Sequence, residues 1–274
     1  MKRFFCMALL LLSACSRNND RVWLGYAEGD DVFVSAPQAG WISRMTVERG
    51  DWVDRGRLLF TLDDTHEAAA RDQATANIAQ AQAELAQEQA NYAYTGRELA
   101  RQIRLKRDKA GVESTYSQAL ASRESSAKRI EQLQGQIRQM EAVLADARYQ
   151  LSQRDVISLT HGRVQDIDFR TGEYAPAQTA IVDILPPENI YVRFFVPEAD
   201  LSKVHLGQRV LVSCDGCPSH LEARVSFIAA QEEFTPPVVF SLENRSRLVF
   251  KIEARAPHGL KINPGQPVDV RPLL

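Results

Sequence analysis

Residues 74–103 read ATANIAQAQAELAQEQANYAYTGRELARQI, and apolar residues recur in this stretch every seven positions. The main series is Ile78, Leu85, Tyr92 and Leu99, and the alternate positions hold Ala74, Ala81 and Ile103. A second run has the same period, with one series at Ile130, Ile137, Leu144 and Leu151 and the other at Leu133, Met140 and Ala147. Two apolar positions per heptad, sustained over this length, predict a coiled coil.

The composition around these runs favours two long helices between residues 64 and 154. The segment contains no proline, and its 91 residues include 19 Ala and 13 Gln but only three Gly, which favours helix. Two helices of about 40–45 residues would each be about 60–68 Å long. A four-helix bundle would need further long helices, and the flanking sequence does not supply them. The segment therefore predicts a projecting antiparallel hairpin.

The ends of the two helices carry their own signals. Gly111 lies between the apolar runs, and glycine readily takes the left-handed conformation that ends a helix. Thr115 and Gln118 have the spacing of a capping box at the start of the second helix. Asp64 and Glu67 have the same spacing at the start of the first. We therefore expect a tight turn near Gly111.

The segments on either side of the hairpin, residues 31–63 and 155–187, repeat each other at an interval of 122 positions. The matching stretches are Gly40-Trp41-Ile42 with Gly162-Arg163-Val164, Gly50-Asp51 with Gly172-Glu173, and Leu59 and Leu62 with Ile181 and Ile184. Alternating apolar residues broken by glycine predict short strands and turns. Because an internal repeat indicates two similar units packed together, we expect one small β-domain in two halves, with the hairpin inserted between them.

A further β-domain is predicted for residues 188–274. Its strand candidates are rich in β-branched residues and are separated by Gly and Pro. They cover residues 190–196, 209–213, 221–228, 248–253 and 268–271. These strands predict a barrel or a sandwich, so the chain as a whole is expected to be a multidomain protein of the α+β class.

The N-terminus has the features of an export signal. Lys2 and Arg3 precede an apolar run of about ten residues, too short for the roughly 20 that span a bilayer. The run ends in Leu12-Ser13-Ala14-Cys15, which resembles the lipobox of bacterial lipoproteins. That resemblance implies removal of residues 1–14, acylation of Cys15 and a membrane anchor, followed by a linker over residues 15–30. An ordinary secretory signal is the alternative interpretation.

Charge and motif content exclude several classes of function. The chain has 33 basic and 35 acidic residues, a formal net charge of −2, whereas nucleic-acid-binding proteins usually carry a clear basic excess. The sequence contains no H-E-x-x-H motif, nucleophile elbow or phosphate-binding loop. We therefore expect no nucleic-acid binding, no enzymatic activity and no cofactor.

Cys214 and Cys217 form the one constellation that could carry chemistry. In an oxidising periplasm the favoured state is a local disulfide that closes a turn. With His220 the two thiols have part of a metal-ligand spacing, but a structural zinc usually has four ligands. Redox catalysis is the third alternative, although redox C-x-x-C motifs lie at a helix start and strands are predicted on both sides here. We favour the disulfide and predict no metal site.

Together these features resemble the membrane fusion protein, or periplasmic adaptor, family, which includes HlyD-like secretion proteins. The first half of that family's split lipoyl-like domain is similar to Ala36-Pro37-x-x-Gly40 and Val47-x-x-Gly50-Asp51-x-Val53-x-x-Gly56, and the second half to Gly162-x-Val164 through Gly172-Glu173. The family's β-barrel is similar to Val196-Pro197-Glu198-x-Asp200-Leu201, Gly207-Gln208-x-Val210 and Pro264-Gly265-Gln266-Pro267-Val268. The resemblance runs from about residue 31 to the C-terminus.

The resemblance implies a subunit that links an inner-membrane transporter to a TolC-like outer-membrane channel, in a ring that is commonly hexameric. Members that serve RND pumps usually continue into a further domain after the barrel, so the resemblance favours an ABC-type transporter. Glu233-Phe234-Thr235-Pro236 and Leu248-Val249-Phe250 also look like the ABC-linked branch. The expected location is the periplasm, anchored through Cys15 to the inner rather than the outer membrane. Ser16 stands where an inner-membrane retention signal has Asp, which leaves the choice of membrane open.

The family docks to its channel through an Arg, a Leu four residues later and a Ser seven beyond that. Arg101 and Leu105 match this pattern, while Val112 stands at the serine position and Ser114 lies two residues late. These four are the candidate docking residues at the hairpin tip. Taken alone, Leu105 reads as a seam residue and Arg101 as part of a solvated helix face. The alternative function is a structural envelope lipoprotein whose coiled coil tethers envelope components.

A lipoyl-type domain could also carry biotin or lipoate, and such a carrier needs a lysine at the turn between its half-motifs. No lysine occurs between Lys2 and Lys106, and residues 58–64 run directly into the predicted helix. The sequence therefore argues against a carrier.

Overall fold

The computed structural model describes residues 22–218, 221–234 and 248–273, and their contacts divide the chain into two compact units. One unit is Val32–Ile184, which holds the hairpin and the small β-domain. The other consists of residues 22–31 and the described residues from 185 onward. The predicted α+β class, with a long hairpin and separate β-domains, is confirmed.

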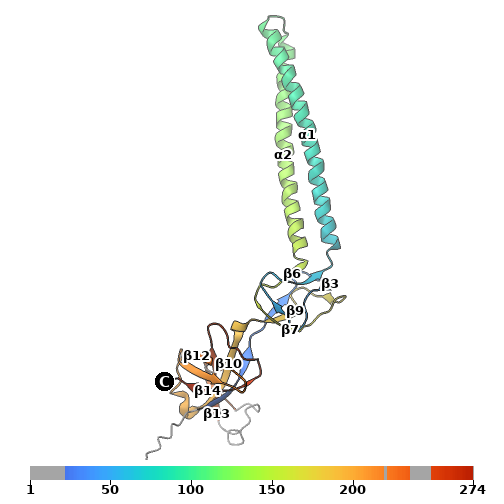
Figure 1. The fold of residues 1–274 in the computed structure, drawn as a ribbon. Helices are drawn as coiled ribbons and strands as arrows, with labels where there is room; N and C mark the ends of the chain where they lie inside the picture. Colours follow the sequence, from blue (N-terminus) through green and yellow to red (C-terminus); the bar gives the residue numbers. More distant parts are fainter. Residues whose placement is uncertain (1–21, 219–220, 235–247, 274) are drawn as a thin grey trace, which may run out of the picture. The chain divides into compact units, whose positions relative to one another are not determined.

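The hairpin consists of α1 (Thr65–Arg107) and α2 (Glu113–Ser152), of 43 and 40 residues. Figure 1 shows the two helices side by side, extending away from the small β-domain. Where the helices meet, the buried residues are Ala74, Ile78, Ala81, Leu99, Ala119, Ser126, Leu133, Ile137 and Leu144. The predicted heptad positions are therefore buried or half-buried along the seam, with one exception near the tip.

Both helices begin differently from the predicted capping boxes. At the start of α1, the Asp64 side chain makes no capping hydrogen bond. The neighbouring Asp63 carboxylate instead accepts from the backbone N–H and the hydroxyl of Thr65, at 3.1 and 2.6 Å. Helix α2 begins at Glu113, so Thr115 already lies inside it and donates its hydroxyl to the Val112 carbonyl. The predicted capping boxes are therefore wrong at both sites.

The small β-domain is a sandwich of two four-stranded sheets. One has the order β2 (Val32–Ser35), β9 (Ala180–Leu185), β7 (Gly162–Ile167), β4 (Trp52–Val53). The other has the order β6 (Asp155–Ile157), β5 (Leu58–Leu62), β3 (Gly40–Met45), β8 (Tyr174–Ala175). Each strand of the first sheet has a counterpart in the second sheet, 122 positions away in the sequence. When every strand of the first sheet is replaced by its counterpart, the strand order of the second sheet results. In each sheet the outer strands thus come from one half of the repeat and the inner strands from the other.

Matching hydrogen bonds join the two halves. The Gly50 N–H donates to the Val164 carbonyl at 2.9 Å, and the equivalent Gly172 N–H donates to the Ile42 carbonyl at 2.8 Å. Both glycines have positive φ, 94° and 90°, a conformation that other residues adopt only at a cost. The side chains of Ile42 and Val164 are buried in the centre of the sandwich. The glycines seen in the repeat therefore mark the points where each half bonds to the other.

The base of the hairpin is fixed to the sandwich by Arg154. Its guanidinium forms an ion pair with Glu67 and donates to the Ala39 carbonyl at 3.0 Å. The Arg154 and Glu67 side chains are both largely buried. Burial raises the pKa of Glu67, but the hydrogen bond and charge of Arg154 outweigh it and hold that pKa below the ordinary value. Glu67 therefore serves the junction rather than the predicted capping box.

The second unit is a closed six-stranded barrel. Its strands follow the order β1 (Trp23–Gly29), β10 (Ile190–Pro197), β13 (Leu248–Arg255), β12 (Leu221–Phe234), β11 (Arg209–Ser213), β14 (Pro267–Pro272). A 3-10 turn, η1 (Pro187–Asn189), and a short helix, α3 (Glu198–Leu201), flank β10. The predicted choice between a barrel and a sandwich is thus resolved as a barrel.

The linker predicted for residues 15–30 is wrong over its second part. Residues Trp23–Gly29 form β1, which pairs with both β10 and β14 and so closes the barrel. Trp23 is buried and stacks on Phe194, with ring centroids 5.7 Å apart. The predicted signal segment, Cys15 and Ser16 lie outside the described residues.

Candidate functional site

The turn between α1 and α2 forms the tip of the hairpin. The Lys109 N–H donates to the Lys106 carbonyl at 3.1 Å and the Ala110 N–H to the Leu105 carbonyl at 2.9 Å. This is a Schellman arrangement, and Lys109 holds its left-handed position with a φ of 60°. The predicted left-handed residue, Gly111, has another role: a Cβ there would lie 2.7 Å from the Lys106 nitrogen. Gly111 therefore allows the chain to pass close to the end of α1.

Side-chain contacts across the turn hold the start of α2 against the end of α1. Lys106 Nζ lies 2.7 Å from Glu113 Oε2 and 4.3 Å from the centroid of the Tyr116 ring. The hydrogen bond with Glu113 is the largest cause that raises the pKa of Lys106. The tip is thus an ordered turn that presents its remaining side chains in a fixed arrangement.

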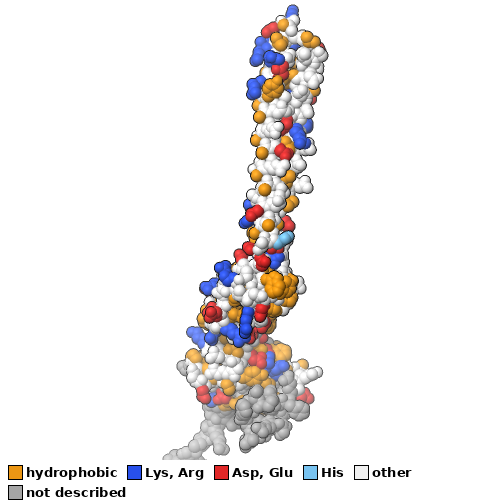
Figure 2. Space-filling view, turned by 90° about the vertical axis from the view of Figure 1, so that its right-hand side faces the viewer, with side chains coloured by type: hydrophobic (Ala, Val, Ile, Leu, Met, Phe, Trp, Pro, Cys, Tyr) orange, Lys and Arg blue, Asp and Glu red, His pale blue; other side chains and the backbone are white. Residues whose placement is uncertain are grey.

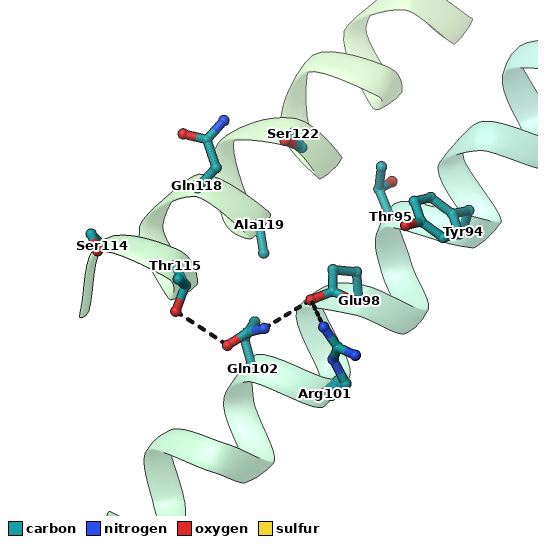
Figure 3. A pocket seen from close by; sticks show the side chains of 10 residues that line it. All are labelled: Tyr94, Thr95, Glu98, Arg101, Gln102, Ser114, Thr115, Gln118, Ala119 and Ser122. Carbon is teal, nitrogen blue, oxygen red and sulfur yellow. Dashed lines mark hydrogen bonds and ion pairs between the residues drawn. The ribbon is translucent and has the colours of Figure 1, made fainter. Parts of the chain in front are cut away.

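A groove of about 580 Å³ separates the two helices just below the turn (Figure 3). Its lining residues are Tyr94, Thr95, Glu98, Arg101, Gln102, Ser114, Thr115, Gln118, Ala119 and Ser122. The structure therefore brings two of the predicted docking residues, Arg101 and Ser114, to the same groove. Leu105 and Val112 lie beyond it, on the turn side.

A hydrogen-bond network crosses this groove from one helix to the other. Thr115 Oγ1 on α2 lies 3.3 Å from Gln102 Oε1, and Gln102 Nε2 donates to Glu98 Oε1 at 2.8 Å. Arg101 Nη2 donates to the same Glu98 oxygen at 2.9 Å, as Figure 3 shows. The hydrogen bond from Gln102 is the main cause that lowers the pKa of Glu98. Glu98 therefore orients Arg101, which the docking pattern alone did not indicate.

Exposed apolar side chains surround the turn. Leu105 and Val112 are exposed, and Ile103, which the heptads place in the seam, is 50% exposed. The seam position is taken instead by half-buried Gln102, three residues after buried Leu99. The prediction for Ile103 is therefore wrong, because the neighbouring Gln102 faces α2 at this turn and contacts Thr115. The i, i+4 spacing of Glu98 and Gln102 is the signal that could have identified the network.

Positive charge is concentrated at the tip. The basic residues of this part of the hairpin are Arg97, Arg101, Arg104, Lys106, Arg107 and Lys109, against the acidic Glu98, Asp108 and Glu113. Figure 2 shows Lys and Arg side chains gathered around the end of the hairpin. The tip therefore combines an apolar and a basic surface, although the chain as a whole is slightly acidic.

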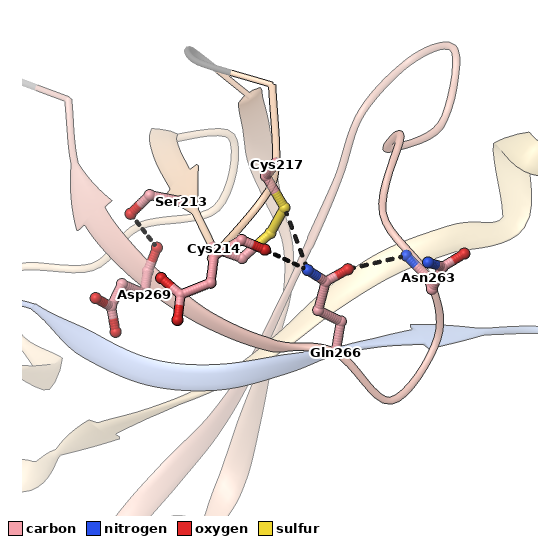
Figure 4. The surroundings of a disulfide bond; sticks show 7 residues. Ser213, Cys214, Cys217, Asn263, Gln266 and Asp269 are labelled. Atoms are coloured by element: carbon pink, nitrogen blue, oxygen red, sulfur yellow. Dashed lines mark hydrogen bonds between the residues drawn. A yellow bond between two sulfur atoms is a disulfide. The ribbon is translucent and has the colours of Figure 1, made fainter.

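The structure joins Cys214 and Cys217 in a disulfide with a Cα–Cα distance of 5.3 Å (Figure 4). The Cys217 N–H donates to the Cys214 carbonyl at 3.2 Å, and Gln266 Nε2 donates to the Asp215 carbonyl at 3.0 Å. The bond thus closes a turn after β11 that is also held from the β14 side. His220 lies outside the described residues. Within the described ranges, no group of three His, Cys, Asp or Glu side chains could hold a metal ion.

The helices of the described part of the chain were also compared with the requirements of a membrane span. None of them combines the length and the apolar character needed to cross a bilayer.

Comparison with known sequences finds several relatives. No family model matches the chain. A UPF0194 membrane protein of Yersinia pestis is 27% identical over 275 residues, which cover 85% of this chain and 83% of the relative. A UPF0194 membrane protein of Acidithiobacillus ferridurans is 31% identical over 139 residues. That match covers 49% of this chain and only 40% of the relative.

Comparison with solved structures identifies the fold. MacA from Actinobacillus actinomycetemcomitans matches 93% of this chain with a TM-score of 0.69 and 19% identity, over 78% of its own chain. The membrane fusion protein Spr0693 from Streptococcus pneumoniae R6 matches 92% of this chain with a TM-score of 0.52 and 18% identity, over 98% of its own chain. The chain therefore has the fold of the membrane fusion proteins.

Proposed function

We propose that this protein is a periplasmic adaptor of a tripartite export system. In this proposal the hairpin docks to a TolC-like outer-membrane channel, and the β-domains face an inner-membrane transporter. The observation that carries it is the ordered hairpin tip, where exposed Leu105 and Val112 stand among basic side chains. An exposed apolar and charged surface at the end of a long hairpin serves an interaction better than it serves stability.

The proposal extends to the other parts of the system. The transporter is of the ABC type, as the resemblance around residues 233–236 and 248–250 suggests. Cys15 carries the lipid that anchors the chain, preferably to the inner membrane. The transporter supplies the energy, and this chain acts as a non-enzymatic connector without a cofactor of its own. Several copies form a ring so that their hairpins surround a duct.

A site-specific photocrosslinker at Val112 tests the partners. It is used in intact cells with a C-terminal affinity tag, and a crosslinker at Glu131, exposed in the middle of α2, is the control. The proposal expects the Val112 position, but not Glu131, to capture an outer-membrane channel, with an ABC permease or ATPase copurifying. Copurification of a different pump would refute the ABC assignment. Capture of peptidoglycan-associated proteins alone would favour the tether function.

A charge substitution at the tip tests the function itself. Leu105→Asp places a charge on the docking surface, so export or drug tolerance should be lost at a normal protein level. Val143→Asp is the matched control, because Val143 is also an exposed apolar residue of the hairpin but lies far from the tip. Unchanged export in the Leu105 variant would contradict docking through the tip.

A further inference from the structure

A cavity of about 770 Å³ lies against the barrel, beside the Cys214–Cys217 disulfide. Its lining comes from β1, from the start of β14 with the turn before it, and from the end of β11 with the turn that follows. Sites for small molecules have volumes of about 300–1,000 Å³. The cavity therefore has the size of a ligand site, and the function proposed above makes no use of it.

The floor of the cavity is the outer surface of three neighbouring strands. Strand β14 pairs with β1 on one side and with β11 on the other, so that Asp269 is opposite both Leu24 and Ser213. Val268 and Val270, on either side of Asp269, belong to the barrel core, and the alternation of a strand therefore directs Asp269 outward. Figure 4 shows Ser213 next to Asp269, where its hydroxyl donates to the Asp269 carbonyl at 3.3 Å. The middle strand of the floor thus presents a carboxylate.

Apolar and aromatic side chains flank this carboxylate. Leu24 and Tyr26 both line the cavity and are half-buried, and Tyr26 is opposite Pro267 in the β1–β14 ladder. The ring of Tyr26 lies against Phe195 of β10, with centroids 6.1 Å apart. Because Phe195 is itself buried, it holds the Tyr26 ring in place. The floor therefore offers a fixed apolar surface beside a negative charge.

The carboxylates of the cavity have no counter-charge. Asp215 and Asp269 both line it, and within the described ranges neither side chain has a hydrogen-bond or ion-pair partner. None of the described residues that line the cavity is basic. The next outward residue of β14, Arg271, lies about 7 Å further along the strand and is exposed. The cavity is therefore suited to a positively charged ligand.

The disulfide turn forms one wall of the cavity. Gln266 Nε2 donates to the Asp215 carbonyl at 3.0 Å and lies 3.6 Å from Cys217 Sγ. The Asn263 N–H donates to Gln266 Oε1 at 3.4 Å, as Figure 4 shows, so the turn before β14 holds the turn after β11. A disulfide across so short a loop stabilises a protein less than one across a long loop. Its main effect here is to fix Asp215 at the edge of the cavity.

We propose that this cavity binds a small organic cation with an apolar body. The positive group would lie at Asp215 and Asp269, and the apolar part would lie against Leu24, Tyr26 and Pro267. The Tyr26 ring would add attraction for the cation. A divalent metal ion is not the expected ligand, because Ca²⁺ takes six to eight oxygen ligands and the described residues form no metal-binding group. The site goes beyond the adaptor function and does not depend on it, since one copy of the chain supplies the whole lining.

Fluorescence polarisation with the purified full chain tests the site. The probe is rhodamine 6G, an apolar dye with a positive charge, and fluorescein, a related dye with a negative charge, is the probe control. We expect saturable binding of rhodamine 6G and at least tenfold weaker binding of fluorescein. The buffer is the same for both dyes and all variants, so that dye held by detergent cancels in the comparison. Equal binding of the two dyes, or no saturable binding of rhodamine 6G, would overturn the proposal.

Charge-removing variants locate the binding within the chain. Asp269→Asn should raise the Kd for rhodamine 6G by about tenfold, because it removes the charge of the floor. Glu198→Gln is the matched control, since Glu198 is an exposed acid of the same unit on α3, outside the cavity. An unchanged Kd in the Asp269 variant, or an equal rise in the two variants, would refute the site. The adaptor function would then still stand on the tip photocrosslinker, because that experiment does not involve the barrel cavity.

The part played by the disulfide is measured with the same probe. Replacing both Cys214 and Cys217 with serine should raise the Kd for rhodamine 6G about threefold, because Asp215 loses its fixed position. Reduction of the unmodified chain with dithiothreitol should have the same effect, and it should not change the double-serine variant further. If reduction leaves the Kd of the unmodified chain unchanged, the disulfide does not position the carboxylate of Asp215 for the ligand.

Discussion

At the turn between the helices, one non-glycine residue has the left-handed backbone conformation that glycine adopts more easily. Lys109 has a φ of 60°, and a left-handed conformation costs an ordinary residue about 1–2 kcal/mol. Lys109→Gly should therefore stabilise the hairpin by about 0.5–1 kcal/mol after the entropy of the added glycine in the unfolded chain is subtracted. Gly111→Ala should destabilise it, because its Cβ would meet the Lys106 nitrogen. Urea unfolding followed by helical circular dichroism measures both, and equal effects of the two changes would contradict this account.

The ion pair of Glu67 and Arg154 makes the hairpin base sensitive to acid. Because the pKa of Glu67 is lowered in the folded state, its contribution is fully present above the unfolded value near 4.5 and is lost as the pH falls through the folded value. Glu67→Gln should cost about 1.5–3 kcal/mol at neutral pH and should remove this part of the acid dependence. Unfolding at pH 7 and pH 3 measures it. A variant that keeps the full acid dependence would show that other carboxylates cause it.

Residue-scale features were the hardest to predict from the sequence. The glycine signal correctly located the turn at residues 108–112, but the left-handed position belongs to Lys109. A capping box needs only a suitable residue at each end, and Glu67 satisfied that spacing although Arg154, 87 residues away, uses its carboxylate. Such a long-range partner is not visible in a local pattern, which is why the capping box predicted for α1 was wrong. The box predicted for α2 was wrong because that helix begins at Glu113, two residues before Thr115.

At the scale of elements, the heptad pattern distinguishes side chains that hold the helices together from those that do not. Leu133 is almost fully buried between α1 and α2, whereas Ile103 is half-exposed beside the groove. Leu133→Ala should therefore destabilise the hairpin by about 2–5 kcal/mol, and Ile103→Ala by about 0.5 kcal/mol or less. Thermal unfolding followed at 222 nm compares them. Similar losses would mean that Ile103 packs in the seam after all.

Elements that repeat were predictable, and elements that depend on a distant partner were not. The heptads located both helices, and the interval of 122 residues located six of the eight strands of the sandwich, all except β2 and β6, because each pattern is sampled many times along the chain. Strand β1 was missed because its seven residues lack a clear alternation and its partners, β10 and β14, lie more than 160 residues away. At the tip, the docking pattern found Arg101 and Ser114 but not Glu98 and Gln102, which bind within the groove.

At the scale of the whole molecule, the two compact units should unfold separately. The Cys214–Cys217 disulfide lies in the barrel unit, and its loop is short, so its loss should lower the stability of that unit by about 2 kcal/mol. In differential scanning calorimetry, replacing both cysteines with serine should lower one transition, and Leu133→Ala should lower the other. A single transition that responds to both changes would show that the units unfold together.

The interleaved sheets of the lipoyl-like domain have a consequence for how the chain folds. Neither half can complete a sheet alone, because each sheet takes its inner strands from one half and its outer strands from the other. The strands to be joined are separated by the whole hairpin, and closing so long a loop carries an entropic cost that slows folding. Helices, in contrast, form from local contacts within microseconds. Once α1 and α2 pair, starting from the turn, their far ends place Leu62 and Asp155 close together. Strands separated by some ninety residues in the sequence can then pair as if they were neighbours. Formation of the hairpin would then speed the folding of the sandwich at its base.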